Sequence, residues 1–142
     1  MSENLTYDVW LPLSDRVDDG GLDDLTVDEQ TVYLCYDFIC QFGNGGLSGY
    51  GYNVDAAERS GLVAALRRIG ALQCADLMHR ANYILNTPVS PNDAKTWEQF
   101  LQIADPNNEL DQIHDSLTDQ IESDGLRDSV DELAAVLANG QS

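Results

Sequence analysis

The 142-residue sequence contains very little positive charge, with seven Lys and Arg against 25 Asp and Glu and a formal net charge of −18 at pH 7. A body of that charge is repelled by phosphate backbones and by anionic lipid. Direct binding of nucleic acid or of a membrane surface is therefore excluded. The natural macromolecular partner is a basic surface.

Long hydrophobic runs and targeting signals are also missing. No apolar run approaches the roughly 20 residues that a membrane-spanning helix needs. The N-terminus lacks the basic and apolar regions of a signal peptide. We therefore expect a cytoplasmic protein.

Cysteine and histidine are scarce, at three and two residues. Cys35, Cys40 and Cys74 form no CxxC pair, so the ligand spacing of a zinc site is absent. We expect buried free thiols in a reducing compartment. The aspartates of residues 18–24 do not follow the calcium-loop pattern. We therefore expect neither a metal nor another cofactor.

Enzyme signatures are absent as well, since the chain has no G-x-S-x-G, P-loop or H-E-x-x-H motif. The run Gly43–Gly46 resembles a phosphate cradle, but no strand precedes it and no Lys or Arg lies close by, so we interpret it as a helix-ending turn. We expect His79 at the surface and His114 as an incidental member of an acidic face. No catalytic residue is assigned, and we expect a protein that is not an enzyme.

Helical periodicity runs through nearly the whole chain, without an alternating strand pattern. Thr26 and Glu29 have the spacing of a capping box, in which each side chain accepts a hydrogen bond from the other residue's amide. Gly43–Gly46, Gly70 and Gly125 mark the ends of later helices. The sequence therefore predicts an all-α fold, a compact single-domain bundle of seven to eight helices.

The boundaries of these elements are expected from caps, glycines and apolar faces. They are a helix over 5–17, a turn over 18–25, a helix from Thr26 to Gly43–Gly46, a loose helical turn over 47–52, a helix over 54–69 capped by Asn53, a helix over 71–85, a helix starting at Ser90–Asp93 with Pro91 at its first position, another starting at Asp105–Pro106, and a last helix after Gly125.

The negative charge is concentrated at the two ends of the chain. Residues 1–30 carry −8, residues 31–104 carry −1, and residues 105–142 carry −9. We therefore divide the single domain 1–142 into an acidic N-terminal segment (1–25), a near-neutral core (26–104) and an acidic helical pair (105–142). Arg67 and Arg68 of the core are expected to pair with the acidic ends and to orient them.

The carboxylates near the C-terminus follow a helical period. Four of them, at intervals of four, four and three residues, form one stripe beside the apolar face of a helix: Asp111, Asp115, Asp119 and Glu122. Four residues of helix rise about 6 Å, and DNA phosphates of one strand are about 3.4 Å apart per base pair along the axis, and farther through space. A carboxylate at every turn therefore imitates a phosphate row.

Two further groups extend the set of phosphate-mimicking carboxylates that we predict to bind a partner. The first continues past Gly125, and the second lies near the N-terminus: Asp124, Asp128, Asp131, Glu132; Asp18, Asp19, Asp23, Asp24. Like charges one turn apart weaken a helix by a few tenths of a kcal/mol per pair, so stability alone favours interleaved lysines. The alternatives are a solvated face that keeps the protein soluble and a salt-adapted surface, although the neutral middle disfavours the second.

The middle of the chain resembles a known family. The resemblance lies in Thr26–Tyr33 (TVDEQTVY), Asn44–Gly46, Ala64–Ala71 (AALRRIGA) and Ala75–Leu77. These segments are similar to the DNA-mimic-protein-nineteen family, a broad bacterial domain. Leu47 stands where the family usually has Phe, and a Gly-rich stretch replaces an aromatic one after it, which indicates a divergent member. The resemblance implies an all-helical fold and, for at least one member, an acidic surface that occupies the DNA-binding face of a transcription regulator.

Our leading hypothesis is a bacterial or phage inhibitor that mimics DNA. Its partner would be a basic DNA-binding protein, namely a transcription regulator, a nucleoid protein or a phage-defence nuclease. The first alternative is an immunity protein that neutralises a basic toxin or nuclease through a few hot spots, with Trp10 or Trp97 as an aromatic anchor. The second is an enzyme with an unrecognised site. A homodimer is compatible with all three.

Overall fold

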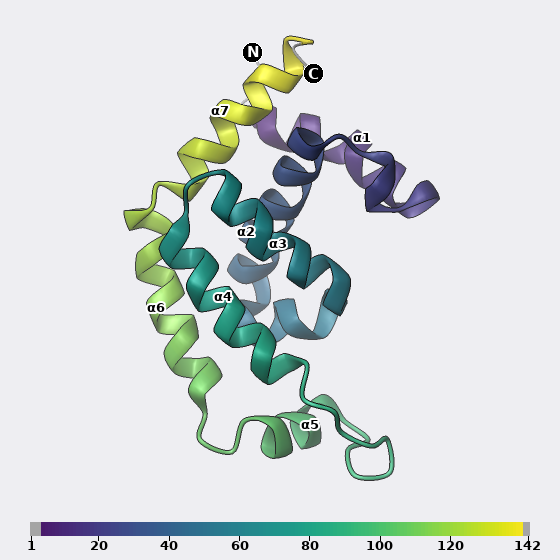
Figure 1. Ribbon diagram of the computed structural model, residues 1–142, viewed down its shortest axis with the longest axis vertical. Helices are drawn as coiled ribbons and strands as arrows, with labels where there is room; N and C mark the ends of the chain where they lie inside the picture. The colour runs from purple at the N-terminus through teal and green to yellow at the C-terminus, as the bar shows by residue number, and fades with distance from the viewer. Residues whose placement is uncertain (1–3, 141–142) are drawn as a thin grey trace.

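The computed structural model describes residues 4–140, and within that range it consists of helices without a strand (Figure 1). The all-α prediction is thereby confirmed, with seven α-helices and one short 3-10 helix in the described range. Their bounds are α1 Leu5–Gly20, η1 Leu22–Asp24, α2 Val27–Asn53, α3 Ala56–Arg68, α4 Leu72–Leu85, α5 Trp97–Ala104, α6 Glu109–Ser123 and α7 Leu126–Ala138. None of these helices is both long enough and apolar enough to cross a membrane.

The start of α2 has the predicted capping box. Thr26 accepts a hydrogen bond from the Glu29 amide, and the Glu29 carboxylate accepts one from the Thr26 amide at 2.9 Å. The predicted cap of the next helix is wrong, because Asn53 is the last residue of α2. Val54 is extended, and Asp55 caps α3 by accepting from the Glu58 amide at 2.9 Å. A buried Val54 therefore displaces the helix start by two residues.

One helix is longer than predicted, because α1 continues through Asp18 and Asp19 and ends only before Gly21, whose φ is 85°. The turn that follows it is therefore shorter than expected. Within α2, Gly46 is not helical (φ 67°, ψ −167°), so the first part of α2 ends at the glycine run as predicted, and a second helical part continues from there to Asn53. Leu47 and Tyr50 are buried after the bend. Their burial holds the Gly-rich stretch in a helix that its own propensity does not favour.

The connection between α4 and α6 also differs from the prediction. Ser90–Asp93 is a turn rather than a helix start, and α5 begins at Trp97 with Thr96 as its cap. α6 starts at Glu109 and not at Pro106. Asp105 still caps it, since its two carboxylate oxygens accept from the Glu109 amide at 2.7 Å and the Leu110 amide at 2.9 Å. The last helix begins after Gly125 as predicted, with φ 64° at the glycine.

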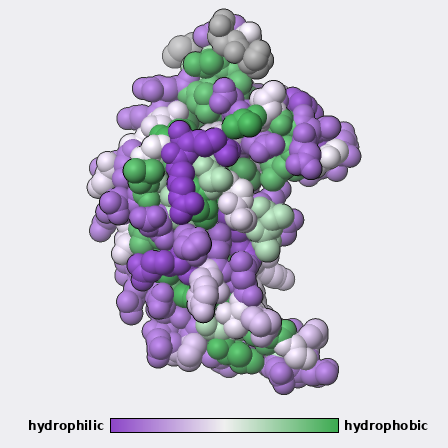
Figure 2. Space-filling model, in the orientation of Figure 1, coloured by the Kyte–Doolittle hydropathy of each residue, from purple (hydrophilic) through white to green (hydrophobic). Residues whose placement is uncertain are grey.

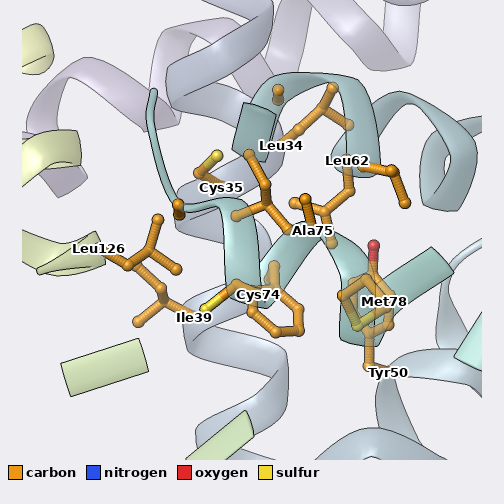
Figure 3. Packing of buried hydrophobic residues seen from close by; sticks show 14 of the residues in the cluster. Leu34, Cys35, Ile39, Tyr50, Leu62, Cys74, Ala75, Met78 and Leu126 are labelled. Carbon is orange, nitrogen blue, oxygen red and sulfur yellow. The ribbon is translucent and has the colours of Figure 1, made fainter. Parts of the chain in front are cut away.

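The core lies where α2, α3 and α4 meet, with α6 packed on α4 and α7 packed on α1 and α2. Figure 3 shows its centre, in which side chains from α2, α3, α4 and the start of α7 interdigitate: Leu34, Cys35, Ile39, Tyr50, Leu62, Cys74, Ala75, Met78 and Leu126. This core positions α6 and α7 along one long side of the molecule (Figure 1).

The cysteines are free, but only two of them are buried. Burial raises the pKa of the Cys35 thiol and of the Cys74 thiol to about 12. Cys40 is exposed, so the expectation of three buried thiols is wrong for this residue. The five-residue interval from Cys35 turns Cys40 to the outer face of α2.

Candidate protein-binding surface

The two C-terminal helices form one continuous edge of the molecule. In Figure 1, α7 and α6 follow each other along the same side, joined at the bend of Gly125. α6 has 15 residues and α7 has 13, which correspond to about 22 and 20 Å of helix. Figure 2 shows mainly hydrophilic residues along this side. The edge is therefore a long and polar surface on a rigid base.

The stripe predicted on α6 lies on its solvent side. Leu110, Ile113 and Leu117 are buried and define the inner face. All four carboxylates of the stripe are exposed and lie on the outer side of the helix, opposite the buried face rather than beside it: Asp111, Asp115, Asp119 and Glu122. The helical period of 3.6 residues places them there. The whole stripe is accessible to a partner.

On α7 the row continues with two further exposed carboxylates, Asp128 and Glu132. We call these two and the four of α6 the outer acidic row. Within residues 4–140, no side chain of this row takes part in a hydrogen bond or an ion pair. The fold therefore makes no polar use of these six charges.

Two of the predicted site residues are used inside the fold instead. Asp124 is half-buried, and its carboxylate accepts a hydrogen bond from the Cys74 amide at 3.1 Å, in the first turn of α4. Asp131 accepts from the hydroxyl of Thr6, which is 3% exposed, and so joins α7 to α1. Both carboxylates are structural contacts at the margin of the row.

The N-terminal carboxylates form a separate surface. Asp18 and Asp19 lie at the end of α1, Asp23 and Asp24 lie in η1, and all four are exposed. α1 crosses from α7 to the opposite side of the molecule in Figure 1, so its end and η1 lie far from α6. The structure thus does not bring the two predicted acidic groups together.

The cations of the chain leave the outer acidic row uncompensated. Between residues 4 and 140, ion pairs join only Arg16 to Glu29 at 2.9 Å and Arg80 to Glu109 at 3.6 Å. Arg68 donates through Nε to the hydroxyl of Thr31 at 3.0 Å and does not pair with the acidic ends. The expectation that Arg67 and Arg68 orient these ends is therefore wrong.

His114 has a structural role that the sequence did not predict. Its ring stacks on Phe42 at 4.7 Å, and its Nδ1 accepts a hydrogen bond from the Leu47 amide at 3.3 Å. That amide is the first one after the bend of α2 at Gly46. His114 thus points inward and supports the bend, whereas His79 is exposed as expected.

The surface also contains concavities that sequence reasoning missed. One of about 580 Å³ lies between the bend of α2, α5 and α6, and includes Glu98, Asp111 and His114 in its lining. A groove of about 400 Å³ lies between α7, the start of α2 and the end of α3. No cluster of three or more His, Cys, Asp or Glu side chains among the described residues is arranged to hold a metal ion. Concavities formed by three helices leave no local signal in the sequence.

A comparison with protein families extends the resemblance found in the middle of the chain. A family model described as DMP19-like protein matches residues 23–139. The matched range includes α6, α7 and the whole outer acidic row. Comparison with curated proteins and with solved structures found no match. Because the family model covers most of the chain, this protein belongs to the DMP19-like family.

Proposed function

We propose that the protein is a DNA mimic, which binds the basic DNA-binding surface of a partner through its outer acidic row and blocks nucleic-acid binding there. The partner is a transcription regulator, a nucleoid protein or a phage-defence nuclease. The observation that carries the proposal is the outer acidic row itself: six exposed carboxylates on one edge, without a polar partner among residues 4–140. Membership of the DMP19-like family is consistent with this role.

The geometry of the row supports mimicry of a charged backbone. Asp111, Asp115 and Asp119 follow one another at four-residue intervals, about 6 Å along the axis of α6. A rigid helix keeps these intervals without paying the conformational entropy that a disordered acidic tail would lose on binding. Carboxylates at such positions can form charge-assisted hydrogen bonds with Arg and Lys side chains that normally hold phosphates.

The repulsion among the carboxylates of the row destabilises α6, which indicates that the row is kept for binding and not for stability. Each like-charged pair one turn apart weakens α6 by about 0.2–0.5 kcal/mol. Arg127, the only Lys or Arg among residues 105–142, is exposed and makes no ion pair within residues 4–140. A field of one sign along an edge instead steers a basic partner and accelerates its association. We propose accordingly that the protein acts by binding and not by catalysis.

Capture of the partner tests this function. The protein is immobilised and exposed to host lysate at low salt, and candidate partners are then examined for DNA binding in purified form. Asp115→Asn with Asp119→Asn removes two charges from the row. Asp76→Asn with Asp93→Asn removes two exposed charges outside it and is the matched control. We expect the first pair to weaken the complex at least tenfold and the second to change it less than threefold. Equal effects of the two pairs would refute the row as the interface.

An immunity protein is the second candidate, because one aromatic cluster lies at the surface. Trp97 stacks on Tyr52 at 5.5 Å and on Phe100 at 5.0 Å, and Tyr52 is 62% exposed. Trp10, the other predicted anchor, instead lies against Tyr33 and Tyr36 between α1 and α2. Tyr52→Ala separates the two functions. A loss of more than 2 kcal/mol marks a hot spot of the immunity type, whereas the DNA mimic should lose little.

A further inference from the structure

The groove beside the outer acidic row combines an apolar floor with a charged rim. Its hydrophobic side chains are Ile69 and Leu133, which are half-buried, and Val136, which is 43% exposed. The carboxylates of Asp28 and Glu132 also line it. In Figure 2, hydrophobic patches interrupt the hydrophilic surface in the upper half of the molecule, where α7 meets α2 and α3. Apolar surface gathered in a concavity is characteristic of a contact site.

The polar groups of the groove limit what can occupy it. Arg68 is the only cation of the lining, and its Nε donates to the hydroxyl of Thr31. With the carboxylates of Asp28 and Glu132, the lining has a formal charge of −1. Glu132 belongs to both the groove and the outer acidic row, and Asp128 lies four residues before it, about 6 Å along α7. An occupant must therefore bury apolar surface while it presents positive charge about one helical turn away.

We infer that the groove receives an apolar side chain from a basic helix of the partner, flanked on that helix by Lys or Arg. The inference rests on the proposed function and adds an anchor to it. Side chains three or four residues apart share one helix face, so an apolar residue can enter the groove while its neighbours reach Asp128 and Asp28. A second copy of this chain is a poorer occupant, because it brings its own charge of −18 to the same edge.

An anchor of this kind would give the interface a component that DNA-like charge alone does not supply. Ion pairs between carboxylates at an exposed edge and the Lys or Arg side chains of a partner mainly set the rate and the salt dependence of association. Burial of an apolar side chain instead slows dissociation and changes little with salt. The groove therefore predicts a part of the affinity that persists as salt is raised.

Two helical peptides test the inference with the intact protein. The first is alanine-based, with one central leucine and a lysine or arginine one turn to either side. The second has alanine in place of the leucine and the same charge. Their affinities are measured by fluorescence anisotropy across a salt series for the wild type, Val136→Ser and Ile103→Ser. Ile103 of α5 is 48% exposed and lies outside the groove, so it is the matched control.

We expect the leucine peptide to bind the wild type about five-fold more tightly than the alanine peptide, as partial burial of a leucine implies. Val136→Ser should remove most of this difference, and Ile103→Ser should preserve it. Equal affinities of the two peptides for the wild type, or an unchanged difference in Val136→Ser, would overturn the anchor.

The salt series separates this failure from a failure of the proposed function. If both peptides bind equally and binding weakens steeply with salt, the groove is refuted while the electrostatic role of the acidic row stands. If neither affinity depends on salt, or neither peptide binds at low salt, both proposals fail.

Discussion

Replacing Asp124 by alanine removes the acceptor that holds the Cys74 amide in the first turn of α4. The two atoms are 3.1 Å apart, and the Asp124 side chain is half-buried between α6 and α7. Loss of a hydrogen bond to a charged group costs about 1.5–3 kcal/mol, and loss of a helix cap about 0.5–2 kcal/mol. We expect a decrease of about 1.5–2 kcal/mol in the free energy of unfolding, where the two ranges overlap.

Urea denaturation followed by circular dichroism measures this loss. With a slope of about 2 kcal/mol per molar urea, the urea midpoint should fall by about 0.75–1 M. Asp124→Asn keeps an oxygen acceptor and should lose less. Asp128→Ala removes the same charge from an exposed position and should stay within about 0.5 kcal/mol of the wild type. An Asp124→Ala midpoint equal to that of Asp128→Ala would refute the structural role of Asp124.

Three further predictions concern pH, packing and thiol chemistry. Burial raises the pKa of Asp37 above its ordinary value of 3.8 and that of Glu58 above 4.5. The folded state therefore favours their protonated forms, and its thermal midpoint should rise as the pH falls from 7 toward those ordinary values. Asp37→Asn should flatten this rise, and a midpoint that falls instead would contradict the prediction. Gly51→Ala would place a Cβ 2.7 Å from a leucine side chain of α4, so the free energy of unfolding measured in urea should fall by about 1–3 kcal/mol. Gly43→Ala is the control, because its Cβ would have nothing within 4 Å and should not lower that free energy. A thiol reagent should modify Cys40 alone in the native protein, and the two buried cysteines only after unfolding; equal rates would count against the packing of α2.

Much of the helical architecture could be predicted because its signals are local. The capping box at Thr26 and the left-handed glycine at Gly125 each act within one turn of chain. The errors arose where distant contacts decide the outcome. Burial of Leu47 and Tyr50 on the core makes the stretch after Gly46 a full helical segment and not the loose turn that was predicted. His114, 67 residues away from Leu47, supports that bend through a contact that no sequence interval reveals.

On the candidate surface, too, local sequence signals predicted some features and distant contacts decided the others. Helical periodicity was enough to place the stripe from Asp111 to Glu122 on one face of α6. It could not distinguish Asp128, which faces solvent, from Asp124, whose carboxylate binds the start of α4 fifty residues away. Nor could it show that the end of α1 and η1 lie far from α6, because their separation follows from how α1 packs on α7 and α2. The groove likewise exists only once three helices meet.

Competition for the partner tests the central claim most directly. The apparent Kd of the purified partner for its DNA is measured at a series of concentrations of this protein. Mimicry requires DNA and this protein to occupy one surface of the partner, so the apparent Kd for DNA should rise linearly with the concentration of this protein and reach no plateau. Asp115→Asn with Asp119→Asn should shift that rise to higher concentrations. An apparent Kd that reaches a plateau, or a ternary complex that contains partner, DNA and this protein together, would contradict the account.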